Sequence, residues 1–316
     1  TMLQMVYLRF VNPRFDQDGH ETFMSLAANY FTSLSKNINS KIRDSVTVTL
    51  YGANNPRRPV VNADYIKGVS FDKVKAVYQD RFGDAGDFEF FIVGDVDKET
   101  LKPLLEKYIA SIPTGKTEED WTDKSVNQIS KNIDTDIYLK MEDPKSQIRI
   151  GYAADYEYNL KNLYIARTLS GILQLRVTET AREDEGGAYS PRGSAGLTQK
   201  PKGRASITIS FDTNPDVAEN MVKLMHGEIK KIADGDIKKE DLEKTLTSFS
   251  KSRKESKENN NYDFSLLQNY IREGYNMNDP KNFEDIISSI NAKDVQKFTK
   301  KVLKNAETYE IIIKPL

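Results

Sequence analysis

The sequence lacks several residue types that common enzyme sites need. Among its 316 residues it has no cysteine and two histidines, His20 and His226. The absence of cysteine excludes disulfides, thiolate catalysis and cysteine metal ligands, although it fixes no cellular compartment. The two histidines are far apart in the chain, and neither has a second histidine or a glutamate at metal-ligand spacing. We therefore expect no metal ligands and no catalytic residue in this chain.

Long apolar runs and an excess of one charge are also absent. The 46 basic and 47 acidic residues give a net charge of −1, so no global field attracts nucleic acid or an anionic membrane. No apolar segment approaches the roughly 20 residues that span a bilayer. A phosphate loop is absent because Gly83-Asp84-Ala85-Gly86 follows a predicted helix and precedes a predicted strand, which is the reverse of a phosphate cradle. We expect no nucleic-acid partner and no membrane-spanning segment.

The chain does contain a repeated pattern of helix, turn and strand. The stretch from Val74 to Ile92 matches the stretch from Val295 to Ile313 at constant spacing. In both copies an amphipathic helix leads through an Asp-Ala or Asn-Ala turn into a strand with alternating apolar residues. Residues from about Trp121 to Met221 precede the second copy and have no counterpart before the first. We therefore expect the second part of one unit, truncated at its start, followed by a complete unit.

Hydrophobic spacing and turn residues place a boundary near residue 114. Before it, the pattern predicts helices over 3–10, 16–35, 70–82 and 98–111, a polar, turn-rich stretch over 38–65 and a buried strand over 88–93. After it, strands are predicted over 136–142, 146–152, 188–190, 204–212 and 309–314, with helices over 160–182, 215–233, 239–256, 262–275 and 292–303.

This order of elements predicts an α+β fold. It indicates two homologous, layered α/β-sandwich domains, each with an antiparallel-rich sheet and helices on one face. The first domain, residues 1–113, is expected to be the second half of such a unit. The second domain, residues 114–316, is expected to be complete.

One local cluster offers groups for binding a ligand. Arg182 stands at the end of the long helix predicted over 160–182, and Tyr189 follows the Gly186-Gly187 turn at the start of a strand. A guanidinium and a phenol in these positions can converge on a carbonyl or an oxyanion. An arginine near a helix C-terminus is also favoured by the helix dipole, and tyrosine is common in strands. The spacing alone therefore leaves an ordinary structural role open.

Two stretches of the sequence resemble a known family. Residues 175–190, with Arg182 and Tyr189 in an Arg-x6-Tyr spacing, and residues 81–113 resemble the C-terminal half of pitrilysin/insulinase-type zinc peptidases, the inverzincins. The likeness covers essentially the whole chain and is greatest to long bacterial members of periplasmic type, in which four homologous α+β domains follow one another. By this resemblance residues 1–113 correspond to the later part of the third domain and residues 114–316 to the fourth.

The resemblance implies a role in peptide hydrolysis. In this family the zinc motif, H-x-x-E-H with a distal glutamate, lies in the first domain, and the C-terminal half forms the other wall of a peptide-degrading chamber. Arg182 and Tyr189 match the pair that holds a substrate carbonyl and helps to stabilise the tetrahedral intermediate. Because this chain has no zinc motif, zinc is expected in the missing N-terminal half, and the fragment alone is expected to be inactive.

The same resemblance implies partners and a compartment. The expected partners are a peptide or unfolded polypeptide substrate and the N-terminal half of the same protein. The expected location is the periplasm or the cell envelope.

Three functional hypotheses follow from these patterns. The preferred one is the C-terminal, non-metal-binding half of a zinc metalloendopeptidase. The second is a non-catalytic structural or partner subunit of the same fold, in which Arg182 and Tyr189 serve binding. The third is an unrelated α+β interaction module whose likeness is accidental, and the repeat together with the motif disfavours it. The sequence upstream of Thr1 would separate the first two.

Overall fold

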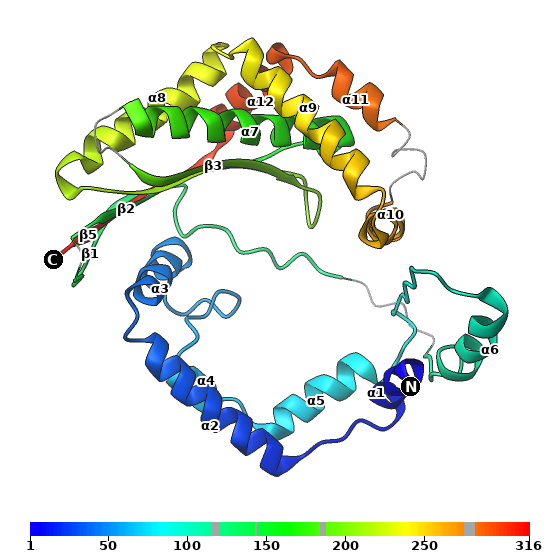
Figure 1. Ribbon diagram of the computed structural model, residues 1–316. Helices are drawn as coiled ribbons and strands as arrows, with labels where there is room; N and C mark the ends of the chain where they lie inside the picture. Colours follow the sequence, from blue (N-terminus) through cyan, green and yellow to red (C-terminus); the bar gives the residue numbers. More distant parts are fainter. Residues whose placement is uncertain (116–120, 143, 184–187, 275–281) are drawn as a thin grey trace.

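A computed structural model describes residues 1–115, 121–142, 144–183, 188–274 and 282–316. Figure 1 shows two regions of different build. Residues 1–113, here the N-terminal region, form an arc of helices, and residues 114–316, here the C-terminal region, form a twisted sheet under a layer of helices. The segment over 121–131 runs through the space between the arc and the sheet.

The sheet has five strands in the order β1-β5-β2-β4-β3. Strands β1 and β5 are parallel, and the other neighbouring pairs are antiparallel. Strand β5, which is last in the sequence, therefore lies between β1 and β2 and is hydrogen-bonded on both sides. This arrangement confirms the predicted α+β class and the antiparallel-rich sheet. The strand bounds are β1 (Asn132–Leu139), β2 (Ser146–Asp155), β3 (Tyr189–Thr198), β4 (Arg204–Thr213) and β5 (Glu307–Pro315).

One face of the sheet carries the main core and a layer of helices. Alternate residues of β2 and β4, such as Ile150 and Ile207, are fully buried, as the period of a half-buried strand requires. They pack with Leu173 on α7, Met225 on α8 and Phe298 on α12 in one continuous cluster. The helices of this layer are α7 (Leu160–Glu183), α8 (Ala218–Asp234), α9 (Lys239–Ser256), α11 (Phe283–Ser289) and α12 (Ala292–Asn305), with a short 3₁₀ turn, η1 (Pro215–Val217), before α8. Helix α10 (Asn260–Glu273) follows α9 and lies beyond the end of the layer, toward the N-terminal region.

The opposite face of the sheet is covered by α3 (Ile38–Tyr51) from the N-terminal region. Ile42 and Leu50 pack on Ile311 and Ile313 of β5 in a second, smaller core. Over 38–51 this helix replaces the polar, turn-rich stretch predicted over 38–65, and the prediction was wrong there, whereas residues 52–62 form a loop as predicted. Its apolar residues Ile38, Ile42, Val46 and Leu50 are four residues apart, and the Asn37 side chain accepts a hydrogen bond from the Ser40 N–H at its start.

The remaining helices of the N-terminal region form the arc below the sheet. An aromatic cluster joins α1 to α5: Phe10 lies 5.6 Å from Phe82 and 4.8 Å from Phe88 between ring centroids. Three residues after Phe88, the ring of Phe91 contacts Phe264 on α10, with 5.9 Å between ring centroids. The helices are α1 (Met2–Val11), α2 (Gln17–Leu34), α4 (Ala63–Lys67), α5 (Phe71–Phe82) and α6 (Lys98–Tyr108).

The two copies of the sequence repeat share their helix and turn but not their strand. Helices α5 and α12 each lead into a buried alanine, Ala85 and Ala306, both 6% exposed. The segment over 88–93 has no strand pairing, and Phe90 is 40% exposed, so the predicted buried strand was wrong there. The physical reason is that a strand needs a partner: β5 is paired by β1 and β2, whereas no strand among the described residues lies beside 88–93.

Candidate functional site

The sequence-predicted site lies where α7 ends and β3 begins. Arg182 is in the last turn of α7, and Tyr189 is the first residue of β3, paired with Asp212 on β4. The side chain of Arg182 and the predicted turn at Gly186-Gly187 lie outside the described residues. The structure therefore places both residues at the same end of the helix–strand pair, and convergence of their side chains remains a prediction.

Tyr189 stands at an irregular start of its strand. The pairing register with β4 shifts between Tyr189 and Arg192, and Ser190 has a φ of 48°, in the left-handed region that non-glycine residues seldom adopt. Such bulges bend a strand and redirect its side chains. Tyr189 is 54% exposed, and the Lys145 ammonium lies 5.8 Å from the centre of its ring. Its ring is thus exposed to solvent beside a cation.

Gln174 fixes the start of β3 against α7. Its amide nitrogen donates a hydrogen bond to the Pro191 carbonyl at 3.0 Å, and its amide oxygen accepts one from the Gly193 N–H at 3.0 Å. Gly193 also has to lack a side chain, since a Cβ there would lie 2.8 Å from Cγ of Leu173. Sequence reasoning missed this residue, because a glutamine on a helix carries no signal of its partner. Its role is to hold the strand that carries Tyr189.

Arg176, one helical turn beyond Leu173, has a structural role. It is 6% exposed, and its guanidinium lies 3.6 Å from Glu228 and 3.1 Å from Asp236. It also donates a hydrogen bond to the Asp236 carbonyl at 2.8 Å. This hydrogen-bonded guanidinium holds the pKa of the Asp236 carboxyl below its usual value. Arg176 therefore ties α7 to the end of α8, and its guanidinium is buried and already bonded, so it is not available to bind a ligand.

The histidines have structural partners. His226 on α8 lies between Tyr152 and Glu310, with its Nε2 2.6 Å from the Glu310 carboxylate and its Nδ1 hydrogen-bonded to the Tyr152 hydroxyl. If neutral His226 donates from Nε2, its Nδ1 is left to accept the Tyr152 proton. Burial, and secondarily the charge of Glu310, raises the pKa of Tyr152 to about 12, so this phenol keeps its proton. His20 packs beside Phe71, with ring centroids 5.0 Å apart.

The contacts of the histidines help to show whether the described residues could hold zinc. A hydrolytic zinc site needs three protein ligands and an open position for water. Among the residues that the structure describes, no group of three His, Cys, Asp or Glu side chains is arranged to hold a metal ion. Both ring nitrogens of His226 are already engaged. The described residues do not fit zinc, and the absence of a metal site from the whole chain stays a prediction.

Comparison with known families decides the class of the protein. The family described as the peptidase M16 inactive domain matches residues 68–249, more than half of the chain. The chain belongs to this family. The matched range runs from α5 to α9 and includes Arg182, Gln174 and Tyr189.

Individual M16 relatives agree with this assignment. A probable zinc protease, PqqL, of Haemophilus influenzae is 27% identical over 124 residues, which are 39% of this chain and 13% of that protein. The crystal structure of the periplasmic protease PqqL from Escherichia coli aligns with 99% of this chain and 34% of its own, at a TM-score of 0.84 and 17% identity. The peptidase M16 inactive domain from Pseudomonas fluorescens aligns with 100% of this chain and 75% of its own, at a TM-score of 0.77 and 16% identity.

The similarities to individual proteins support less than the family match does. At 16–17% identity the two solved structures support the M16 fold alone. The chain spans about a third of the Escherichia coli protein and a smaller part of the Haemophilus protein. Within the described part of the chain, no helix combines the length and the apolar character needed to cross a membrane.

Proposed function

We propose that this chain is the C-terminal, non-metal-binding half of a zinc metalloendopeptidase and forms the substrate-binding wall of its peptide-degrading chamber. The observation that carries the proposal is the match of the M16 inactive domain across residues 68–249. The Haemophilus relative is described as a probable zinc protease, and the described residues of this chain do not fit zinc. Hydrolytic zinc then belongs to the other half of the longer protein.

The role of this chain is to hold the peptide. A phenol at the start of β3 donates a hydrogen bond to a substrate carbonyl, and the bond strengthens as the oxygen gains negative charge. A guanidinium at the end of α7 supplies a fixed positive charge and further donors. Tyr189 and Arg182 are the residues we propose for these two parts. The exposure of Tyr189 and the fixation of its strand by Gln174 support the assignment.

The proposed domain division is 1–113 and 114–316. It is supported by the distribution of buried residues, because the continuous core lies in the second of these ranges. In the first, large apolar side chains on α1 and α2 are exposed, among them Met2, Met5, Leu8, Phe23 and Leu26. We propose that the N-terminal half of the same protein covers part of this surface.

The proposed compartment is the periplasm or the cell envelope. Its support is the Escherichia coli relative, which is described as a periplasmic protease. Cell fractionation of the producing organism, with an antibody against residues 132–316, tests it. Recovery with cytoplasmic markers would refute this part of the proposal.

Substitution of Arg182 in the longer protein tests the function. We expect Arg182→Ala to lower kcat/KM for a peptide by about a hundredfold, the usual cost of losing one donor to an oxyanion. The control is Arg167→Ala, an exposed arginine on the same helix whose guanidinium lies over the Tyr164 ring at 5.2 Å. Zinc content and melting temperature should match wild type in both variants. Equal rates in the two variants, or a longer protein without zinc, would refute the proposed function.

A further inference from the structure

A cavity of about 550 Å³ opens between the sheet and the N-terminal region. It lies on the side of the sheet that α3 covers, and residues from both regions line it. The N-terminal region contributes the end of α3 and the loop after it. The C-terminal region contributes residues 124–128, the strands β2, β4 and β5, and the end of β3 with the turn before β4. The cavity therefore exists only because the two regions meet.

The lining of this cavity is strongly basic. Among the residues that the structure describes, five cationic side chains and no carboxylate line it: Arg57, Arg58, Lys124, Lys202 and Arg204. Since the whole chain has a net charge of −1, this concentration of positive charge is local. A concave site lined by one sign of charge focuses the field and attracts ions of the opposite sign.

Two of the five cations are already neutralised by neighbours outside the cavity. The Lys202 ammonium lies 2.8 Å from the Asp155 carboxylate, and Arg204 bridges Asp155, at 3.3 Å, and Glu307 across the sheet. Arg57, Arg58 and Lys124 have no such ion-pair partner among the described residues.

Within the described residues, no carboxylate lies at ion-pair distance from those three cations. The guanidinium of Arg58 lies over the Tyr51 ring at 5.2 Å, which leaves its N–H groups available. Three positive charges thus remain for a ligand.

The chemistry of the lining favours carboxylates over a compact phosphate group. The free cations come from two segments, at 57–58 and at 124, so single charges spread along a chain match them better than one dense charge. Hydroxyls of Ser206 and Thr208 on β4 add neutral donors to the floor. Helix α3 ends at the rim, where Tyr51 lies, and the partial negative charge of this end disfavours a dense anion more than single carboxylates.

We propose that this cavity binds an acidic segment of a peptide, whose Asp and Glu carboxylates are held by Arg57, Arg58 and Lys124. A guanidinium binds a carboxylate through two parallel hydrogen bonds, which gives the site its preference for acidic side chains. The proposal rests on the proposed function in taking a peptide as the ligand. It adds a second contact, apart from Tyr189, that selects which peptides the chamber retains.

The test is direct binding to the 316-residue chain, measured by fluorescence anisotropy. The probe is a labelled peptide rich in glutamate, and the comparison peptides have the same length but carry lysine or serine in its place. We expect the acidic peptide alone to bind, and its affinity to fall as the salt concentration rises from about 20 mM to about 200 mM, because salt screens exposed charges. Equal binding of the serine peptide, or no binding of the acidic one, would overturn the proposal.

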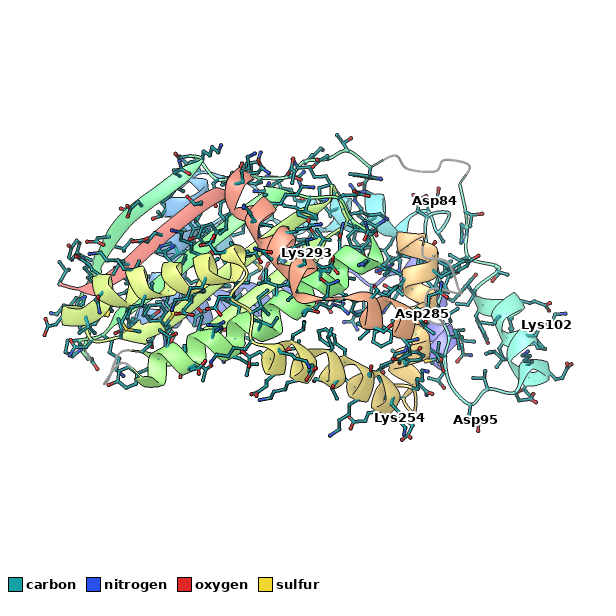
Figure 2. All side chains as sticks on the ribbon, turned by 90° about the horizontal axis from the view of Figure 1, so that it is seen from above. Asp84, Asp95, Lys102, Lys254, Asp285 and Lys293 are labelled. Atoms are coloured by element: carbon teal, nitrogen blue, oxygen red, sulfur yellow. The ribbon has the colours of Figure 1, made fainter. Side chains whose placement is uncertain are left out.

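Charge-matched variants locate the binding. Arg57→Ser/Lys124→Ser should weaken the affinity by roughly tenfold at low salt, as expected for the loss of two partly exposed ion pairs. The control is Lys254→Ser/Lys293→Ser, which removes the same charge from exposed positions on α9 and α12, in the helical layer seen from above in Figure 2. It should leave the affinity unchanged. An equal loss in both variants would show non-specific attraction and contradict the proposal.

Competition with tripolyphosphate distinguishes a carboxylate site from a phosphate site. Displacement at a lower concentration than the unlabelled acidic peptide needs would make the cavity a phosphate site and refute our assignment. The binding measurement needs no hydrolysis. Loss of binding in the Arg57→Ser/Lys124→Ser variant therefore supports the cavity even if Arg182→Ala leaves peptidase activity unchanged. If instead Arg182→Ala lowers peptidase activity while Arg57→Ser/Lys124→Ser binds the acidic peptide as wild type does, the cavity proposal is refuted and the proposed function is not.

Discussion

Phe298 and Phe23 are the same residue type on amphipathic helices in the two regions, yet Phe298 is 1% exposed and Phe23 is 66% exposed. The difference extends to the regions as a whole. The C-terminal region has one continuous core between its sheet and its helices. In the N-terminal region, Ile42 and Leu50 are buried by the sheet of the other region rather than by their own neighbours. The C-terminal region thus holds its own fold, whereas the N-terminal region depends on the surfaces it meets.

The largest effect that this comparison predicts is on core phenylalanines. Phe298→Ala should lower the free energy of unfolding by about 3–5 kcal/mol, because it removes a fully buried ring and leaves a cavity. Phe23→Ala should change it by no more than about 0.5 kcal/mol, as for other exposed positions. Denaturant unfolding of both variants measures the difference. Similar losses in the two variants would mean that Phe23 is buried in solution.

A smaller effect is expected at the contact between the regions. Ile42→Ala should cost roughly 2–4 kcal/mol, since Ile42 is 3% exposed against β5. Ile271→Ala on α10 is the control, because this isoleucine is 44% exposed. Denaturant unfolding again measures both losses. If α3 were detached from the sheet in solution, Ile42→Ala would be as mild as the control, which would contradict the packing of α3 on β5.

The smallest predicted effect is a dependence on pH within the C-terminal region. The Arg176 guanidinium lowers the folded-state pKa of Asp236 below its usual value of 3.8. The stabilisation from this pair is therefore present above pH 3.8 and is lost as the pH falls through the lower, folded-state value. Unfolding midpoints at a series of pH values down to about 3 should fall more steeply for wild type than for Asp236→Asn. Parallel curves for the two proteins would contradict the assignment of this pair.

Much of the C-terminal region is predictable from the sequence. The helix over Lys239–Ser256 has the bounds that its spacing predicts, and strand β4 differs from its prediction by one residue. These elements combine a clear hydrophobic period with turn residues at their ends, so local pattern and burial agree.

The elements that could not be predicted depend on distant partners. Helix α3 contains the β-branched run Val46-Thr47-Val48-Thr49, which disfavours a helix locally, and its burial comes from β5 at the other end of the chain. The segment over 88–93 has the alternation of a strand, but among the described residues it has no neighbouring strand to pair with. In each case the deciding partner is absent from the local sequence.

Part of the candidate site could also be predicted from the sequence, and part could not. The positions of Arg182 and Tyr189 at a helix end and a strand start follow from hydrophobic period and turn residues, and the structure agrees. The proposed roles of the two residues came from the family resemblance, because their spacing left a structural role open. The hydrogen bonds of Gln174 depend on how α7 packs on β3, and the basic cavity joins segments far apart in the chain, so only the folded structure reveals them.

The central claim, that this chain supplies a peptide-holding donor, is tested most directly by removing one hydroxyl. Tyr189→Phe in the longer protein should lower kcat/KM for a peptide by about a hundredfold and leave the melting temperature unchanged. Tyr138→Phe is the matched control, because Tyr138 on β1 is also 54% exposed. It should retain wild-type kinetics. Wild-type kinetics in Tyr189→Phe, or a loss explained by a lower melting temperature, would contradict the claim.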